Sequence, residues 1–115
     1  MWADIEVGLA RYQMLLERDK YLPAIIAACQ SVIKDAQVYL TGSVLRGEAV
    51  AGSDVDLLVV GNIPPSHYEQ VVAVAEIEER ALLPMVHPFE FHLLSEDGFT
   101  FWQKIFGGPL KKLSK

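Results

Sequence analysis

GSVLRGEAVAGSDVDLLVV, residues 42–60, joins a Gly-Ser turn to a buried strand through two aspartates. The apolar run Leu57–Val60 predicts a central strand, and Asp54 and Asp56 lie where that strand begins. Side chains two residues apart on a strand point to the same face. Two adjacent carboxylates repel each other unless a cation joins them, and oxygen ligands of this kind suit Mg²⁺. The segment therefore predicts a site for a metal ion and for a ligand that carries phosphate.

The patterns on either side of this segment predict one small α+β domain. Helices are expected at residues 2–19, 23–34, 66–83 and 95–106, from apolar residues at helical spacing and from capping residues. Strands are expected at residues 37–40, 54–60 and 88–94. This order predicts an α+β fold (an α/β mixed sheet) with three or more strands in a mixed sheet flanked by helices, as a single domain over residues 1–115.

Composition excludes some classes of function. The 115 residues carry a net charge of −5, which argues against broad nucleic-acid binding through the phosphate backbone. The lysines near the C-terminus, Lys104, Lys111, Lys112 and Lys115, are interpreted as a solvated tail. No apolar run is long enough to cross a bilayer, and Cys29 in the run AIIAACQ favours a buried thiol in a reducing compartment. We therefore expect a cytoplasmic protein that does not enter a membrane.

The Gly-Ser turn is a candidate for holding phosphate. The residues after it, Val44–Gly47, predict one helical turn with amides open to an anion, and Ser43 adds a hydroxyl. Arg46 adds a planar fork of donors within a turn of that serine. Taken alone, however, a Gly-Ser pair is most often a plain turn, and Arg46 can equally be an ordinary surface arginine.

A third acidic residue is predicted to join the two aspartates. Glu90 lies between Phe89 and Phe91 in the expected strand 88–94. On a neighbouring strand it would face the aspartates; the alternative is that it lies on the solvent side while the phenylalanines point inward. His92 shares the face of Glu90 and is interpreted as a polar neighbour rather than a catalyst.

The combined pattern resembles the DNA polymerase β-like nucleotidyltransferase superfamily. It reads G-S-x10-D-x-D, from Gly42-Ser43 to Asp54-Val55-Asp56, with a later strand acid. The small size is similar to the minimal nucleotidyltransferase (MNT) domains of prokaryotes, and the resemblance covers residues 37–94. It implies that a hydroxyl attacks the α-phosphorus of a nucleoside triphosphate, the nucleotide substrate, and expels pyrophosphate.

The resemblance also assigns roles to residues. It implies that the nucleotide is bound at Gly42, Ser43, Arg46 and Ser53, and that the catalytic and metal-binding residues are Asp54, Asp56 and Glu90. Two Mg²⁺ ions would stabilise the entering and leaving oxygens. Glu90 would polarise or deprotonate the acceptor hydroxyl.

The acceptor is expected to come from another molecule, because larger family members bind it with a second domain. MNT domains resemble antitoxins that attach adenylate, the AMP part of ATP, to a helical HEPN-type toxin, so the resemblance implies such a partner. A homodimer is a further possibility. The alternative hypothesis is a catalytically weak module that binds nucleotide or a partner without turnover.

Overall fold

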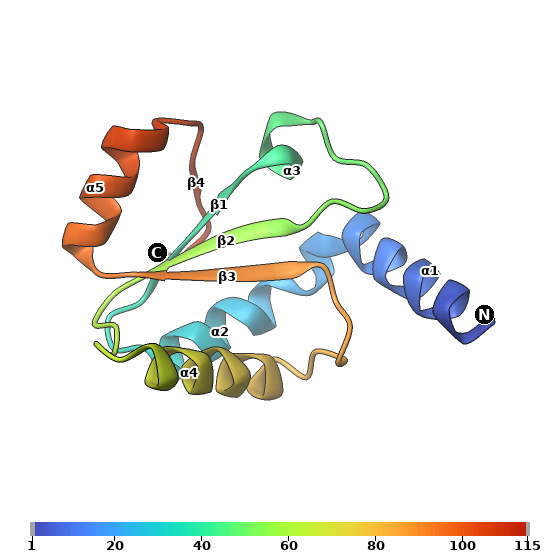
Figure 1. The fold of residues 1–115 in the computed structure, drawn as a ribbon, viewed down its shortest axis with the longest axis horizontal. Helices are drawn as coiled ribbons and strands as arrows, with labels where there is room; N and C mark the ends of the chain where they lie inside the picture. The colour runs from blue at the N-terminus through green and yellow to red at the C-terminus, as the bar shows by residue number, and fades with distance from the viewer. Residues whose placement is uncertain (1, 115) are drawn as a thin grey trace.

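A four-stranded mixed sheet forms the centre of the molecule (Figure 1), in a computed structural model that describes residues 2–114. The strands are β1 Gln37–Thr41, β2 Val55–Val60, β3 Phe89–Leu94 and β4 Lys111–Lys112. Their order is β3-β2-β1-β4, with β2 and β3 parallel and β1 antiparallel to both β2 and β4. The α+β class and the mixed sheet are as predicted.

Helices cover both faces of this sheet. They are α1 Trp2–Leu16, α2 Leu22–Val32, α3 Ser43–Arg46, α4 His67–Arg80 and α5 Glu96–Phe106, with a 3₁₀ turn at Arg18–Lys20. Helices α2 and α4 lie on one side of the sheet and α5 on the other (Figure 1). Within residues 2–114, no helix combines the length and the apolar character needed to span a bilayer.

One face of β2 packs into the hydrophobic core, and the other face carries Asp56, a residue of the candidate site. Val55, Leu57 and Val59 are fully buried in the core with α2 and α4. The alternate residues Asp56 and Leu58 point to the opposite face, because successive side chains on a strand alternate. The candidate site can therefore lie on one face of β2 while the other face supplies the hydrophobic stabilisation.

Serine caps fix the helices that connect the strands. The hydroxyl of Ser66 accepts a hydrogen bond from the Glu69 amide at 3.1 Å, and Ser95 accepts one from Gly98 at 3.0 Å. Both helix starts were predicted from the sequence. Since α4 connects two parallel strands, it brings the first residues of β2 and β3 to the same end of the sheet.

Helix α1 forms as predicted, but most of its apolar side chains are exposed. Helix α1 projects from the body of the molecule (Figure 1), and Trp2 and Leu9 are 79% and 63% exposed. Only Met14 and Leu15, on its last turn, are buried. The helical periodicity of the apolar residues therefore identified the helix but not the side that packs.

The C-terminal segment is a strand, and its interpretation as a solvated tail was wrong for two of the lysines. Lys111 and Lys112 pair with Leu40 and Tyr39 of β1, and the Leu113 amide donates to the Val38 carbonyl at 2.8 Å. The lysine side chains remain exposed while their backbone closes the sheet edge, which is a common use of lysine on edge strands. Lys115 lies outside the described residues.

Candidate functional site

The Gly-Ser turn connects β1 to the short helix α3, as the sequence predicted. Gly42 has φ of +85°, a backbone conformation that favours glycine. A β-carbon added at this position would overlap a carboxylate oxygen of Asp56. Gly42 thus satisfies two conditions at once: it makes the turn, and it lets the backbone approach Asp56 closely.

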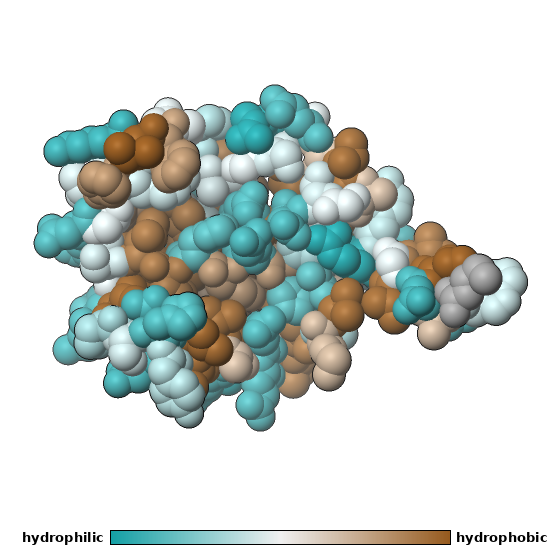
Figure 2. All heavy atoms as spheres, in the orientation of Figure 1, coloured by the Kyte–Doolittle hydropathy of each residue, from teal (hydrophilic) through white to brown (hydrophobic). Residues whose placement is uncertain are grey.

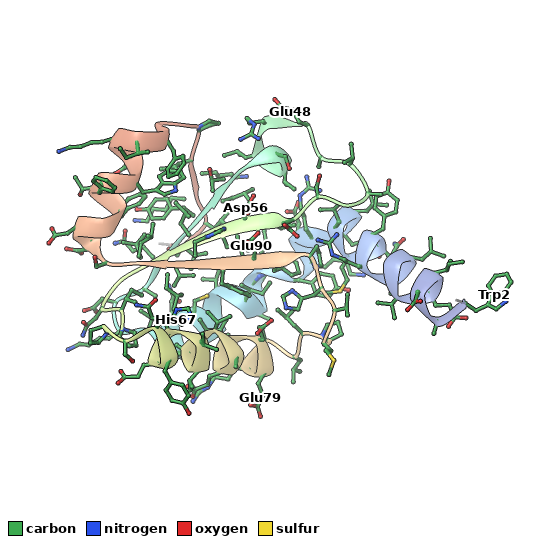
Figure 3. All side chains as sticks on the ribbon, viewed as in Figure 1. Trp2, Glu48, Asp56, His67, Glu79 and Glu90 are labelled. Carbon is green, nitrogen blue, oxygen red and sulfur yellow. The ribbon has the colours of Figure 1, made fainter. Side chains whose placement is uncertain are left out.

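The strand register brings the predicted acids together. Asp56 on β2 lies opposite Glu90 on β3 and opposite Thr41 on β1. Figure 3 shows Asp56 and Glu90 side by side on their neighbouring strands. Each of the two alternatives for Glu90 holds in part. The Glu90 side chain is half-exposed while Phe89 is buried on the core side, as the solvent-facing alternative expects. Glu90 nevertheless lies opposite Asp56, as the metal-site alternative expects.

His92 lies in the same cluster and is, as predicted, a polar neighbour of Glu90. Its Nε2 atom lies 3.2 Å from Asp56 Oδ1 and 3.9 Å from Glu90 Oε1. One ligand atom from each of Asp56, Glu90 and His92 lies within 4.8 Å of the others. The spacing of His92 two residues after Glu90, on the same strand face, was the sequence signal for this position.

Asp54 lies near Glu90, and one of its carboxylate oxygens is bound by Arg11. The guanidinium of Arg11 donates to Asp54 Oδ1 at 2.6 Å and to the Ala51 carbonyl at 3.5 Å. The Arg11 side chain is only 18% exposed, so the pair is partly shielded from water. Sequence reasoning missed Arg11, although it is the one basic residue between Trp2 and Leu16.

The pKa of Glu90 is raised above that of an isolated glutamic acid. Burial raises the pKa of Glu90, and the nearby carboxylates of Asp54 and Asp56 raise it further, while the charge of His92 opposes them. A cation at the cluster would relieve this repulsion. Two carboxylates and an imidazole within reach of one point fit a divalent metal ion, and the carboxylates are the ligands that Mg²⁺ prefers.

The two remaining predicted nucleotide-binding residues have different surroundings. Arg46 forms an exposed ion pair with Glu48 at 3.3 Å, a weak contact from which its guanidinium can turn toward an anion. The Ser53 hydroxyl accepts a hydrogen bond from the Val50 amide at 2.8 Å and so closes the loop before β2. Arg46 lies beside the cluster, whereas Ser53 shapes the loop that leads to it.

A cavity of about 520 Å³ adjoins the cluster. Its lining combines polar residues of the site with aromatic residues of α5: Thr41, Gly42, Arg46, Asp56, Leu58, His92, Trp102, Phe106 and Gly108. Another cavity, of about 330 Å³, lies around Asp35, Gly61 and the start of α5 and includes none of the clustered residues. The chemistry and the larger volume therefore coincide at one place.

Residues 22–105 match the family model of the nucleotidyltransferase domain. The chain belongs to this family. The match includes the Gly-Ser turn, all three predicted acids and His92, and it confirms the resemblance drawn from the motif. Among curated proteins, none matches the chain.

Two solved structures, both described provisionally as nucleotidyltransferases, share the fold. One has 23% sequence identity and a TM-score of 0.63, and the alignment covers 81% of this chain and 97% of that chain. The other, from Sulfolobus solfataricus, has 19% identity and a TM-score of 0.55, with 84% of this chain and 78% of that chain covered. At these identities the likeness establishes a common nucleotidyltransferase fold.

Proposed function

We propose that this protein is a Mg²⁺-dependent nucleotidyltransferase of the polymerase β-like type that moves AMP from ATP to a hydroxyl group. The observation that carries the proposal is the position of Asp56, which faces Glu90 across β2 and β3 and touches the Gly42 turn from the other side. A phosphate held at the turn would lie beside the acids. This is the arrangement that phosphoryl-group chemistry needs, because positioning and charge stabilisation supply most of the catalysis.

The residues of the site have distinct roles in the proposed reaction. Ser43 and the amides of α3 bind the phosphates, and Arg46 moves from Glu48 to neutralise their charge. The acceptor oxygen forms a bond to the α-phosphorus while the bond to the bridging oxygen breaks and pyrophosphate leaves. Glu90 accepts the proton of the acceptor hydroxyl, a task that suits a carboxylate whose pKa is raised above its ordinary value by burial.

The residues that would hold metal are Asp56, Glu90 and His92, with Asp54, which Arg11 also binds, as a further ligand. A bound divalent ion would supply electrostatic stabilisation of the charge that develops on the phosphate oxygens. The protein residues position this charge next to the Gly42 turn. The Arg11 contact occupies Oδ1 of Asp54 and therefore competes with a metal ion for this carboxylate.

The acceptor in this proposal is a hydroxyl on a helical HEPN-type partner, for which the protein would act as an antitoxin in a prokaryotic cytoplasm. Support comes from the motif and the small size, which resemble those of small domains that modify such partners. Exposed apolar side chains on α1 offer surface for a protein contact, either with a partner or with a second copy.

Transfer of labelled AMP tests the reaction. The wild-type protein, incubated with labelled ATP, Mg²⁺ and a co-expressed HEPN-type protein, is expected to label that protein. Asp56→Asn should abolish the transfer, while Glu79→Gln, on the exposed face of α4 away from the site, should leave it intact. Labelling that persists in Asp56→Asn at the wild-type rate would refute the proposal.

A second candidate function is nucleotide binding without turnover. The Arg11–Asp54 ion pair favours it, because Arg11 neutralises one of the carboxylates that a catalytic metal site would use. Metal-dependent ATP binding with no release of pyrophosphate, both in the wild type and in Arg11→Gln, would support this module. Pyrophosphate release by either protein would favour the enzyme.

A further inference from the structure

The cavity beside the acidic cluster is lined by residues of two kinds. Gly42, Arg46 and Asp56 are polar positions, and Leu58, Trp102 and Phe106 are apolar; because α3 and α5 lie apart in Figure 1, we call the part near α3 the polar end and the part near α5 the apolar end. Its volume, about 520 Å³, lies within the range typical of small-molecule sites. A ligand that fills it must therefore join an anionic part to a flat or apolar part.

The apolar end is built by two aromatic rings one helical turn apart on α5. The ring centroids of Trp102 and Phe106 are 5.5 Å apart, and the rings are tilted by 37°. Phe106 is 68% exposed, so most of this ring is not covered by the protein. Figure 2 shows hydrophobic atoms gathered over α5 next to hydrophilic atoms over β2 and β3.

Helix α5 also contacts the sheet through an aromatic residue outside this pair. That contact is made one turn earlier by Phe99, whose ring lies 4.8 Å from the ring of Tyr39 on β1. Phe99 is half-buried, in contrast to Phe106. The aromatic face predicted along this helix thus divides into a packing residue, Phe99, and a pair that faces the cavity.

We propose that Trp102 and Phe106 form the base-binding wall of the nucleotide site and select purine over pyrimidine nucleotides. This inference rests on the proposed function and extends it to the base. Aromatic side chains bind bases by stacking, and the larger ring system of a purine gives more contact area. The phosphates would then lie at the polar end, near Arg46 and the Gly42 turn.

The same wall is expected to distinguish adenine from guanine only weakly. Reading the edge of a base takes hydrogen-bonding groups that are free to point at it. Among the described residues that line the cavity, the Thr41 hydroxyl already donates to the Pro109 carbonyl at 3.2 Å. Asp56 and His92 belong to the acidic cluster. Stacking, which every base can provide, is left as the main interaction.

Nucleotide titrations monitored by calorimetry test the wall. With Mg²⁺ present, we expect wild-type protein to bind ATP and GTP with similar affinity and CTP more weakly. Trp102→Ala should weaken ATP binding by about 5- to 150-fold, the range expected for loss of one stacked ring. Trp102→Phe should retain part of the affinity. Phe101→Ala, which removes an exposed ring of the same helix outside the cavity, is the matched control.

Inorganic tripolyphosphate separates the two ends of the cavity. Trp102→Ala should bind it like the wild type, whereas Asp56→Asn should lose Mg²⁺-dependent binding of both tripolyphosphate and ATP. If Asp56→Asn weakens ATP binding and Trp102→Ala does not, the wall proposal is wrong and the proposed function stands. If Trp102→Ala lowers only the transfer to a protein acceptor, the rings contact the acceptor and the proposal is also overturned. If neither ATP nor tripolyphosphate binds the wild type, the proposed function fails first.

Discussion

Replacing Gly42 with alanine should disable the metal site through the backbone, without removing any ligand. The φ of +85° and ψ of −164° at this position lie in a region that essentially only glycine adopts. The strain should cost about 1–3 kcal/mol, or a fall in melting temperature of roughly 4–12 °C for a domain of this size. In addition, the new methyl group overlaps the carboxylate of Asp56, which must move away. We expect the affinity for Mg²⁺ to fall by about 10- to 100-fold, as for loss of a group that orients a ligand.

Gly47→Ala is the matched control for this prediction. Gly47 also has a positive φ, +74°, but a β-carbon there meets no atom within 4 Å. It should lower stability by about 1–2 kcal/mol and leave metal affinity unchanged. The assay is the rise in melting temperature on adding Mg²⁺, which depends on the affinity of the folded state for the ion. If both variants show the wild-type rise, the contact between Gly42 and Asp56 does not shape the metal site.

Three further predictions concern other groups. Arg11→Gln should raise Mg²⁺ affinity by up to about tenfold, because Asp54 loses its competing cation. The same change should lower the free energy of unfolding by no more than about 1 kcal/mol. Calorimetry that shows weaker Mg²⁺ binding would contradict this prediction. Glu90→Gln should raise the melting temperature of the metal-free protein at pH 7 but not at pH 4. Burial and Asp54 raise the pKa of Glu90 above 4.5 in the folded protein. The stability that protonated Glu90 contributes is therefore lost as pH rises through that pKa, and glutamine, which carries no charge, avoids this loss. Thermal melts of both proteins at pH 7 and pH 4 check this prediction. An equal change in melting temperature at the two pH values would contradict a raised pKa of Glu90. Burial raises the pKa of the Cys29 thiol to about 12, so a disulfide reagent at pH 8 should modify it only after denaturation; rapid reaction of the native protein would show that the core opens.

The strands β1 to β3 and the approach of Glu90 to Asp56 were predictable because they follow from short-range patterns. Alternation in β3 placed Glu90 and Phe91 on opposite faces, and the apolar run of β2 made it the central strand. The register that sets Asp56 against Glu90 is a tertiary property, and the sequence predicted only that Glu90 would lie on a neighbouring strand and face the aspartates. The capping serines fixed the helix starts in the same local manner.

Features that depend on distant segments were not predictable. Arg11 reaches Asp54 across 43 positions of sequence, and nothing near either residue indicates the pairing. Periodicity in α1 could not say whether its apolar side is covered, since that depends on what packs against it. The edge strand β4 was missed because paired lysines have little intrinsic preference for strands, and its pairing depends on the exposed edge of β1.

The short strand β4 has a consequence for motion at the site. It has two residues, and its contact with β1 closes a long loop, as in the bond from the Val38 amide to the Ser114 hydroxyl 76 positions away. Such an edge is expected to open locally at a lower free energy than the core strands. Helix α5 leads directly into this segment, so opening of β4 would release one end of the helix that carries Trp102 and Phe106. The aromatic side of the cavity would then move on a faster timescale than the acidic side, which is fixed by β2 and β3 at the centre of the sheet.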